Sequence, residues 1–325
     1  LAGKMPDYLV IQHMEPDHSA SIPAFLKKYP NATVVSTAKG FQFMEQFFPE
    51  FFAGQGLPAE QRIVAANDGV LELGQHSLHF VYAPMVHWPE VMMTYEATEK
   101  ILFAADGFGK FGALDVEEEW TDEARRYYIG IVGKYGPQVQ AVLKKAAGLD
   151  IQTICSLHGP VLKENLGFYL EKYDKWSSYQ PEESGVVIAY ASVYGNTRNA
   201  AEYLADVLQE KGQKTVLYDL ARCDKAKAVA DAFRYDKLVL AGITYNGDLF
   251  PCMRSFIEGL TERNYQNRKV AIIENGTWAP MAGKLILGMF EKSKNLTFTE
   301  TTVSIKSAMN EQNKKEIGKL AEELS

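Results

Sequence analysis

Residues 13–18 read His13-Met14-Glu15-Pro16-Asp17-His18, and this stretch decides the fold of the first half of the 325-residue chain. It follows an apolar, strand-like segment at 7–12 and precedes a helix expected from about residue 21. Four of its six side chains are potential metal ligands, a density that a polar surface loop rarely reaches. A metal site is therefore predicted at this strand end.

Three later segments offer further ligands at strand ends marked by Gly or Pro. They are His87 in Met-Val-His-Trp-Pro (85–89), Asp106 in Phe-Ala-Ala-Asp-Gly (103–107) and His158 in Ser-Leu-His-Gly-Pro (156–160). The remaining histidines, His76 and His79, lie in an alternating run at 71–82. We interpret that run as a strand whose histidines pair with neighbouring side chains.

The spacing at 13–18 resembles the HxHxDH motif of the metallo-β-lactamase fold, with Glu15 in place of the second histidine. The resemblance implies an α/β fold, an αββα sandwich that presents ligands along one edge of its sheets. Mixed histidine and carboxylate ligands favour iron over zinc.

A second domain is expected after the polar segment 177–185, which contains Pro and Gly, so we place domains at 1–180 and 181–325. Beyond the boundary, apolar strand-like runs alternate with helical segments, as in a doubly wound parallel sheet of five strands. The strands are expected at 186–191, 215–220, 237–244, 269–273 and 297–305, and the helices at 199–211, 225–235, 250–264, 282–294 and 310–324. A ligand is expected at the carboxyl ends of the strands.

Three loops at those strand ends predict a mononucleotide site. The first runs from strand into helix with hydroxyls, an Asn and one Gly, which suits a phosphate but matches neither GxGxxG nor a Walker loop. The other two each carry one large aromatic residue that could stack on a planar ring. The loops resemble those of a flavodoxin, which implies FMN held by Ser192, Val193, Tyr194, Gly195, Asn196, Thr197, Thr244, Tyr245, Asn246, Gly247, Asn275, Gly276, Thr277, Trp278 and Ala279.

The ordered set of both motif groups resembles the flavodiiron proteins, also called A-type flavoproteins, across essentially the whole chain. In that family a non-haem diiron centre reduces dioxygen to water or nitric oxide to nitrous oxide, and FMN relays the electrons. The resemblance implies that one iron is held by His13, Glu15 and His87 and the other by Asp17 and His158, with Asp106 as the bridge. His18 binds the second iron in some members only.

The resemblance also implies partners. Electrons would come from an external donor such as rubredoxin, a deazaflavin or a reductase, and the chain would form a head-to-tail homodimer or a dimer of dimers. Trp88 and Phe108 are expected either to line the dimer interface or to pack beneath the ligand loops. Family members carry further strand hairpins upstream, so the first part of the lactamase-like domain is expected to be absent from this chain.

The composition of the chain narrows the classes of function that remain possible. The chain has 34 Lys+Arg against 41 Asp+Glu, a net charge of −7, which disfavours a nucleic-acid partner. No apolar run reaches the length of a bilayer span, and three scattered cysteines fit a reducing cytoplasm. Two alternatives stay open: a metal-dependent hydrolase with a regulatory flavodoxin module, and an electron carrier whose lactamase-like half is inert.

Overall fold

The computed structural model describes residues 3–52 and 57–325, which divide into two compact units. The first unit ends at Asp174 and the second runs from Lys175 to Ser325. This division falls inside helix α7 (Leu166–Ser177), whereas the sequence places the boundary after residue 180. Within the described residues, no helix has both the length and the apolar character needed to cross a membrane.

The first unit contains two sheets. The strands β1, β2 and β3 form a parallel three-stranded sheet, and β4 to β8 form a five-stranded sheet that is antiparallel except between β7 and β8. The strands are β1 (Tyr8–Val10), β2 (Thr33–Ser36), β3 (Arg62–Val64), β4 (Val70–Glu72), β5 (Ser77–Tyr82), β6 (Met92–Glu96), β7 (Ile101–Phe103) and β8 (Thr153–Cys155).

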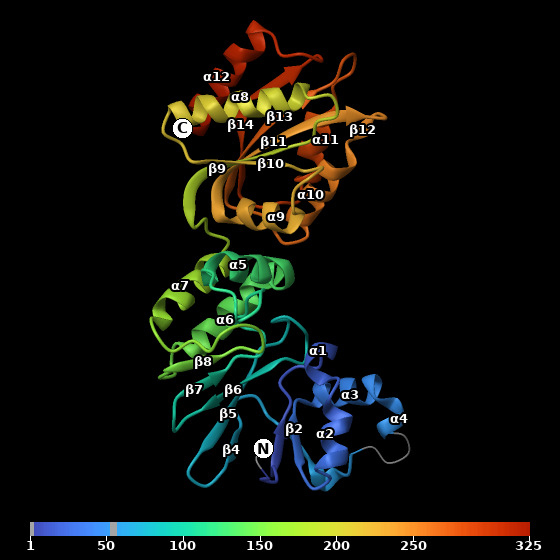
Figure 1. Ribbon diagram of the computed structural model, residues 1–325, viewed down its shortest axis with the longest axis vertical. Helices are drawn as coiled ribbons and strands as arrows, with labels where there is room; N and C mark the ends of the chain where they lie inside the picture. Colours follow the sequence, from blue (N-terminus) through green and yellow to red (C-terminus); the bar gives the residue numbers. More distant parts are fainter. Residues whose placement is uncertain (1–2, 53–56) are drawn as a thin grey trace. The chain divides into compact units, whose positions relative to one another are not determined.

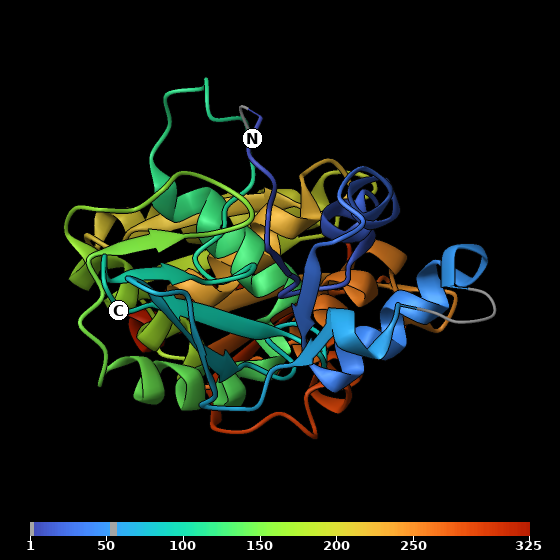
Figure 2. The same ribbon diagram turned by 90° about the horizontal axis from the view of Figure 1, so that it is seen from below.

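Helices cover the outer sides of both sheets, and apolar side chains fill the layer between the sheets. Val35 and Ala65, from β2 and the end of β3, cluster with Phe80 and Met92 of the other sheet. Figures 1 and 2 show α2 to α4 on the side of β2 that faces away from the five-stranded sheet. This is the expected αββα sandwich, with helices α1 (Pro16–Ser19), α2 (Ile22–Lys28), α3 (Ala38–Phe47), α4 (Pro49–Phe52), α5 (Trp120–Ile131) and α6 (Gly136–Ala146), and short 3-10 turns η1 (Ala59–Gln61) and η2 (Gly133–Tyr135).

The run at 71–82 is a hairpin, and the expectation of one continuous strand is wrong. Strands β4 and β5 pair antiparallel, and the turn between them closes with a hydrogen bond from the Leu73 amide to the His76 carbonyl. Gly74 has φ +80° in this turn, a conformation that glycine adopts without steric cost. The apolar alternation falls on Leu71 and Leu73 before residues 74–77 and on Leu78, Phe80 and Tyr82 after them, so its change of phase marks the turn.

The second unit has the predicted five parallel strands in the order β10-β9-β11-β13-β14. A two-residue strand, β12, pairs antiparallel with β11 and was not anticipated. The elements are β9 (Glu183–Tyr190), α8 (Asn196–Glu210), β10 (Thr215–Asp219), α9 (Lys225–Arg234), β11 (Tyr235–Tyr245), β12 (Asp248–Leu249), α10 (Pro251–Thr261), β13 (Arg268–Asn275), α11 (Ala282–Met289), β14 (Leu296–Ile305) and α12 (Glu311–Leu324).

Helices pack on both faces of this sheet, as its apolar strands require. Helices α8 and α12 share one buried cluster with β9, β11, β13 and β14, and α9 to α11 lie on the opposite face (Figure 1). The strand order reverses beside β9, which is the switch point where such sheets bind ligands. Gly195, with φ +92°, turns the chain there and lets α8 begin at Asn196, earlier than expected.

Candidate functional site

The segment 13–18 leads from β1 directly into α1. Glu15 is the N-cap residue of α1, and Pro16 takes the first helical position, where its fixed φ and missing amide hydrogen are tolerated. His13 and Glu15 therefore lie on the extended segment, whereas Asp17 and His18 lie on the first turn of the helix. One strand end thus presents four candidate ligands from two backbone conformations.

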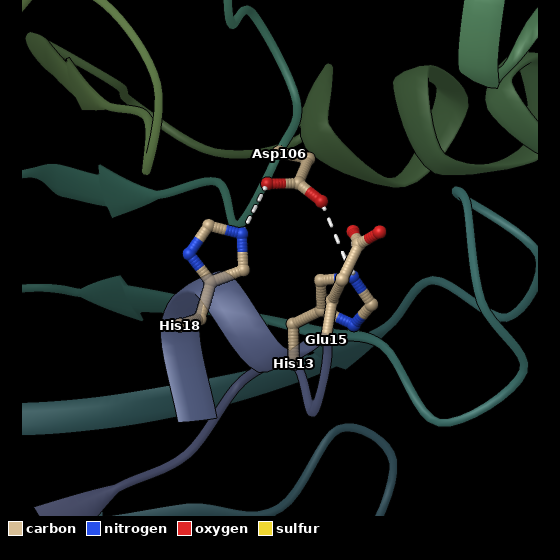
Figure 3. Close-up of side chains that lie close together, drawn as sticks. All are labelled: His13, Glu15, His18 and Asp106. Carbon is tan, nitrogen blue, oxygen red and sulfur yellow. Dashed lines mark hydrogen bonds and ion pairs between the residues drawn. The ribbon is translucent and has the colours of Figure 1, made fainter. Parts of the chain in front are cut away.

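The carboxylate of Asp106 lies between two groups of these side chains. Its Oδ1 is 3.0 Å from His18 Nε2 and 3.6 Å from His158 Nε2. Its Oδ2 is 3.3 Å from His13 Nε2 and 3.1 Å from His87 Nε2. Figure 3 shows the two oxygens directed toward opposite histidines. Asp106 follows β7 and is only 2% exposed, so its two oxygens are fixed within the protein.

The other two carboxylates complete the two groups. Glu15 Oε2 lies 3.3 Å from His13 Nε2 and 3.0 Å from His87 Nε2. Asp17 Oδ2 lies 3.2 Å from His158 Nε2. The structure thus brings together all seven residues predicted as metal ligands, namely His13, Glu15, Asp17, His18, His87, Asp106 and His158.

Glu90 supports this cluster and was missed by sequence reasoning. Its Oε1 accepts hydrogen bonds from His13 Nδ1 at 2.7 Å and from the Met14 amide at 2.9 Å, and the side chain is buried. Burial alone would raise the pKa of Glu90, but the His13 and Met14 hydrogen bonds outweigh it and the pKa is lowered. A carboxylate on the second ring nitrogen is the usual way to orient a metal-binding histidine.

The cluster is chemically suited to cations. Because His13 donates Nδ1–H to Glu90, a neutral His13 directs its Nε2 lone pair toward Glu15 Oε2 and Asp106 Oδ2. Asp106 Oδ2 is buried and accepts no hydrogen bond from the described residues. Lone pairs that converge in a buried space repel one another unless a cation lies between them. The residues therefore fit a metal ion on this side of Asp106.

The pKa shifts of Asp106, His18 and His87 also indicate a cluster suited to positive charge. Burial alone would raise the pKa of Asp106, but hydrogen bonding from His18 and the charge of the surrounding histidines hold it below its usual range. For His18 and His87, burial alone would lower the pKa, but the Asp106 carboxylate outweighs it and both values are raised. Nearby positive charge therefore stabilises the ionised carboxylates, and either protons or metal ions can supply it.

Tyr127 of α5 is a second residue that sequence reasoning did not identify. Its ring lies 5.5 Å from that of His158, between centroids. Burial, followed by the negative charge of Asp106, raises the pKa of its hydroxyl, so the group is neutral at pH 7. Tyr127 therefore places an uncharged side chain beside the carboxylates.

Of the two alternatives for Phe108, the structure supports packing within the first unit. Phe108 is 4% exposed and stacks on Tyr173 with ring centroids 4.3 Å apart. Trp88 packs against Phe47 and meets the His13 ring edge-on, with centroids 5.2 Å apart. These rings support the ligand loops from within the first unit.

The two spare histidines lie outside the cluster. His76 Nδ1 is 3.0 Å from Glu96 Oε1, and His79 Nε2 is 3.3 Å from Ser77 Oγ. Both therefore pair with neighbours in the five-stranded sheet.

A cavity of about 530 Å³ opens at the carboxyl edge of the second sheet. Every residue predicted to hold FMN lines it except Gly195, which forms the turn before α8. Sequence reasoning missed three lining residues, Ile243, Met281 and Ser307. Tyr194 and Trp278, which are 92% and 90% exposed, leave their aromatic faces available to a planar ring.

Two helices begin near this cavity, but only one has its first amides available to an anion. At α11 the amides of Met281 and Ala282 donate to Thr244 Oγ1, and that of Gly283 donates to Glu274 Oε2. Helix α8 has no side-chain cap at its N-terminus. The start of α8 is therefore where the residues fit a phosphate group.

Comparison with known proteins agrees with the folds of both domains. Residues 4–159 match the family described as ODP family beta lactamase, and residues 187–315 match the flavodoxin domain. The chain therefore has a lactamase-like domain followed by a flavodoxin domain. A flavodiiron protein from Giardia intestinalis superposes with a TM-score of 0.87 and 24% identity, covering 98% of this chain and 80% of that one. Rubredoxin oxygen:oxidoreductase from Desulfovibrio gigas gives a TM-score of 0.89 at 23% identity, again with 98% and 80% coverage, and at such identities the likeness shows the fold alone.

Relatives of the chain include a nitric oxide reductase from Moorella thermoacetica. It is 27% identical over 289 residues, which cover 86% of this chain and 70% of the relative. Diflavin flavoprotein A 1 of Synechocystis is 33% identical over 226 residues, covering 67% of this chain and 38% of the relative. The chain spans 38% to 63% of the length of the first curated relatives that it matches.

Proposed function

We propose that this chain is an oxidoreductase that reduces dioxygen to water, nitric oxide to nitrous oxide, or both, with two iron ions and FMN. The observation that carries the proposal is the placement of Asp106, whose two oxygens face separate groups of candidate ligands. Relatives named nitric oxide reductase and flavorubredoxin support the same activity.

The ligands would divide as the distances group them. His13, Glu15 and His87 would hold one iron, Asp17 and His158 the other, and Asp106 would bridge the two. His18 Nε2, 3.0 Å from Asp106 Oδ1, is close enough to join the second group. The mixture of imidazole and carboxylate favours iron over zinc.

The flavin cavity would hold FMN with its phosphate at the start of α8 and its ring beside Tyr245 and Trp278. When bound, FMN accepts two electrons and releases them one at a time, and the irons supply the site where the diatomic substrate is reduced. The residues of the chain would orient FMN and the irons. Glu90 fixes the ring of His13, and the neutral hydroxyl of Tyr127 adds no further negative charge to the pocket.

We also infer an external electron donor and a head-to-tail homodimer in which the flavin of one chain serves the irons of another. The name of the Desulfovibrio gigas protein, rubredoxin oxygen:oxidoreductase, supports a donor of the rubredoxin type. The exposed Trp278 and Tyr194 at the flavin cavity leave that edge open to a partner. The three free cysteines support a reducing compartment, and we place the protein in the cytoplasm.

Turnover by the reconstituted protein tests the proposal. Protein loaded anaerobically with Fe²⁺ and FMN, and reduced by a rubredoxin and its reductase, should consume dioxygen or nitric oxide. Asp106→Asn should lose this activity, because it removes the charge facing both ligand groups. If the purified protein instead contains zinc and hydrolyses esters or lactams without consuming either gas, the hydrolase alternative is correct.

The dimer has its own test. A variant that lacks FMN and a variant that lacks iron should regain activity when mixed and allowed to exchange subunits. Full activity in a preparation shown to be monomeric would contradict the arrangement between chains.

A further inference from the structure

The amide of Asn275 joins three loops of the flavin cavity. Asn275 ends β13 and is 6% exposed. Its Oδ1 accepts from the Ser307 amide at 3.0 Å, and its Nδ2 donates to the Ser307 carbonyl at 2.9 Å and to Thr197 Oγ1 at 3.4 Å. The first turn of α8, the end of β13 and the turn after β14 are thereby linked through one side chain.

These contacts fix which way the amide points. The Ser307 amide can only donate and its carbonyl can only accept, so the oxygen and nitrogen of Asn275 cannot be exchanged. Both hydrogens of Nδ2 are then used, one by Ser307 and one by Thr197. Asn275 therefore has no donor left for a phosphate, although it lines the cavity.

The two partners of Asn275 are themselves placed at the cavity. Thr197 lies in the first turn of α8 and lines the cavity, and because its Oγ1 accepts from Asn275, its own O–H is free to donate. Ser307 has φ +72°, a conformation that a serine rarely holds without support. Its hydroxyl lies 2.9 Å from Thr277 Oγ1.

We propose that Asn275 is a positioning residue for the phosphate of FMN, which acts by orienting the Thr197 hydroxyl and holding the Ser307 turn without touching the phosphate itself. The inference rests on the proposed binding of FMN and extends it, because it assigns the phosphate contact to Thr197 and the α8 amides. Loss of the Asn275 amide should therefore weaken binding of the phosphate group more than binding of the flavin ring.

Comparison of FMN with riboflavin isolates this effect. Each flavin is titrated into the full-length apoprotein, and binding is followed by quenching of flavin fluorescence. Asn275→Ala should lower affinity for FMN about 10-fold and for riboflavin much less, because only FMN carries the phosphate. Asn275→Asp keeps an acceptor for the Ser307 amide but cannot donate to Thr197 and adds a negative charge. It should reduce the ratio of FMN to riboflavin affinity further.

Asn310→Ala is the matched control. Asn310 caps α12 through the Asn313 amide and does not line the cavity, so its loss lowers stability without altering the phosphate contacts. The ratio of affinities should stay at the wild-type value, while urea unfolding shows the reduced stability.

The outcomes separate this inference from the proposed function. If wild-type protein fails to bind FMN, both are wrong. If wild-type protein binds FMN but Asn275→Ala and Asn275→Asp leave the affinity ratio unchanged, or lower both affinities equally, only the positioning role is wrong. If Asn275→Ala does not fold, the ratio measured for Asn275→Asp decides in the same way.

Discussion

Removal of the Glu90 carboxylate should weaken metal binding although Glu90 is not itself a ligand. In the structure Oε1 accepts both hydrogen bonds, from His13 and Met14, and Oε2 has no hydrogen-bond partner among the residues described. Glu90→Gln can keep both hydrogen bonds through its one oxygen, so it removes the charge and replaces Oε2 with an amide nitrogen. Glu90→Ala also leaves two buried N–H groups without their acceptor.

The two Glu90 variants should therefore lose different amounts of metal affinity. Loss of a carboxylate behind a metal-binding histidine costs about 10-fold to 100-fold in metal affinity, or about 1.4 to 2.8 kcal/mol. We expect Glu90→Gln near the lower value and Glu90→Ala near the upper. Anaerobic titration with Fe²⁺ in competition with a chromophoric chelator measures both.

Glu60→Gln, on the exposed turn η1, is the matched control and should bind iron as the wild type does. Circular dichroism and urea unfolding should accompany each titration, to show that the variants are folded. If folded Glu90→Ala binds Fe²⁺ with wild-type affinity, then Glu90 does not orient His13 and the reasoning is refuted.

Four further variants test the metal site, the flavin site and the pH dependence of stability. Asp106→Ala should lose iron from both positions, whereas Cys155→Ser should retain it, as elemental analysis would show. Trp278→Ala should weaken FMN binding by roughly 1 to 3 kcal/mol in fluorescence titration, with unchanged urea unfolding because the side chain is 90% exposed. Burial alone would raise the pKa of Glu96, but hydrogen bonds from the following backbone amides and His76 lower it to about 2. Its stabilising contribution is complete above about pH 4.5 and is lost as pH falls toward 2, so the stability difference between wild type and Glu96→Gln should narrow over that range.

The parts of the fold that repeat a local pattern could be predicted from sequence. Alternating apolar runs and helical segments identified all five parallel strands of the second sheet, because buried strands and amphipathic helices leave direct periodic signals. The hairpin at 71–82 was not predicted because β4 is only three residues long, although Gly74 and the change of phase after Leu73 mark its turn. The two-residue strand β12 is too short to leave a pattern.

The site could be predicted where ligands stand at strand ends, and not where a residue acts through another. Asp106 and His158 each follow an apolar run, so the sheet edge that gathers them could be anticipated. Glu90 has no such signal, because its role depends on contact with His13, 77 residues away in the chain. Ser307 likewise enters the flavin cavity through its partnership with Asn275, which no spacing within the sequence reveals.

Iron stoichiometry with Mössbauer spectroscopy tests most directly whether Asp106 is shared by two irons. Apoprotein is titrated anaerobically with ⁵⁷Fe²⁺, the bound iron is counted per chain, and the sample is then oxidised for the spectrum. We predict two irons per folded chain that are magnetically coupled after oxidation, because Asp106 would hold both. A single iron per chain, or two irons that show no coupling, would contradict a shared site at Asp106.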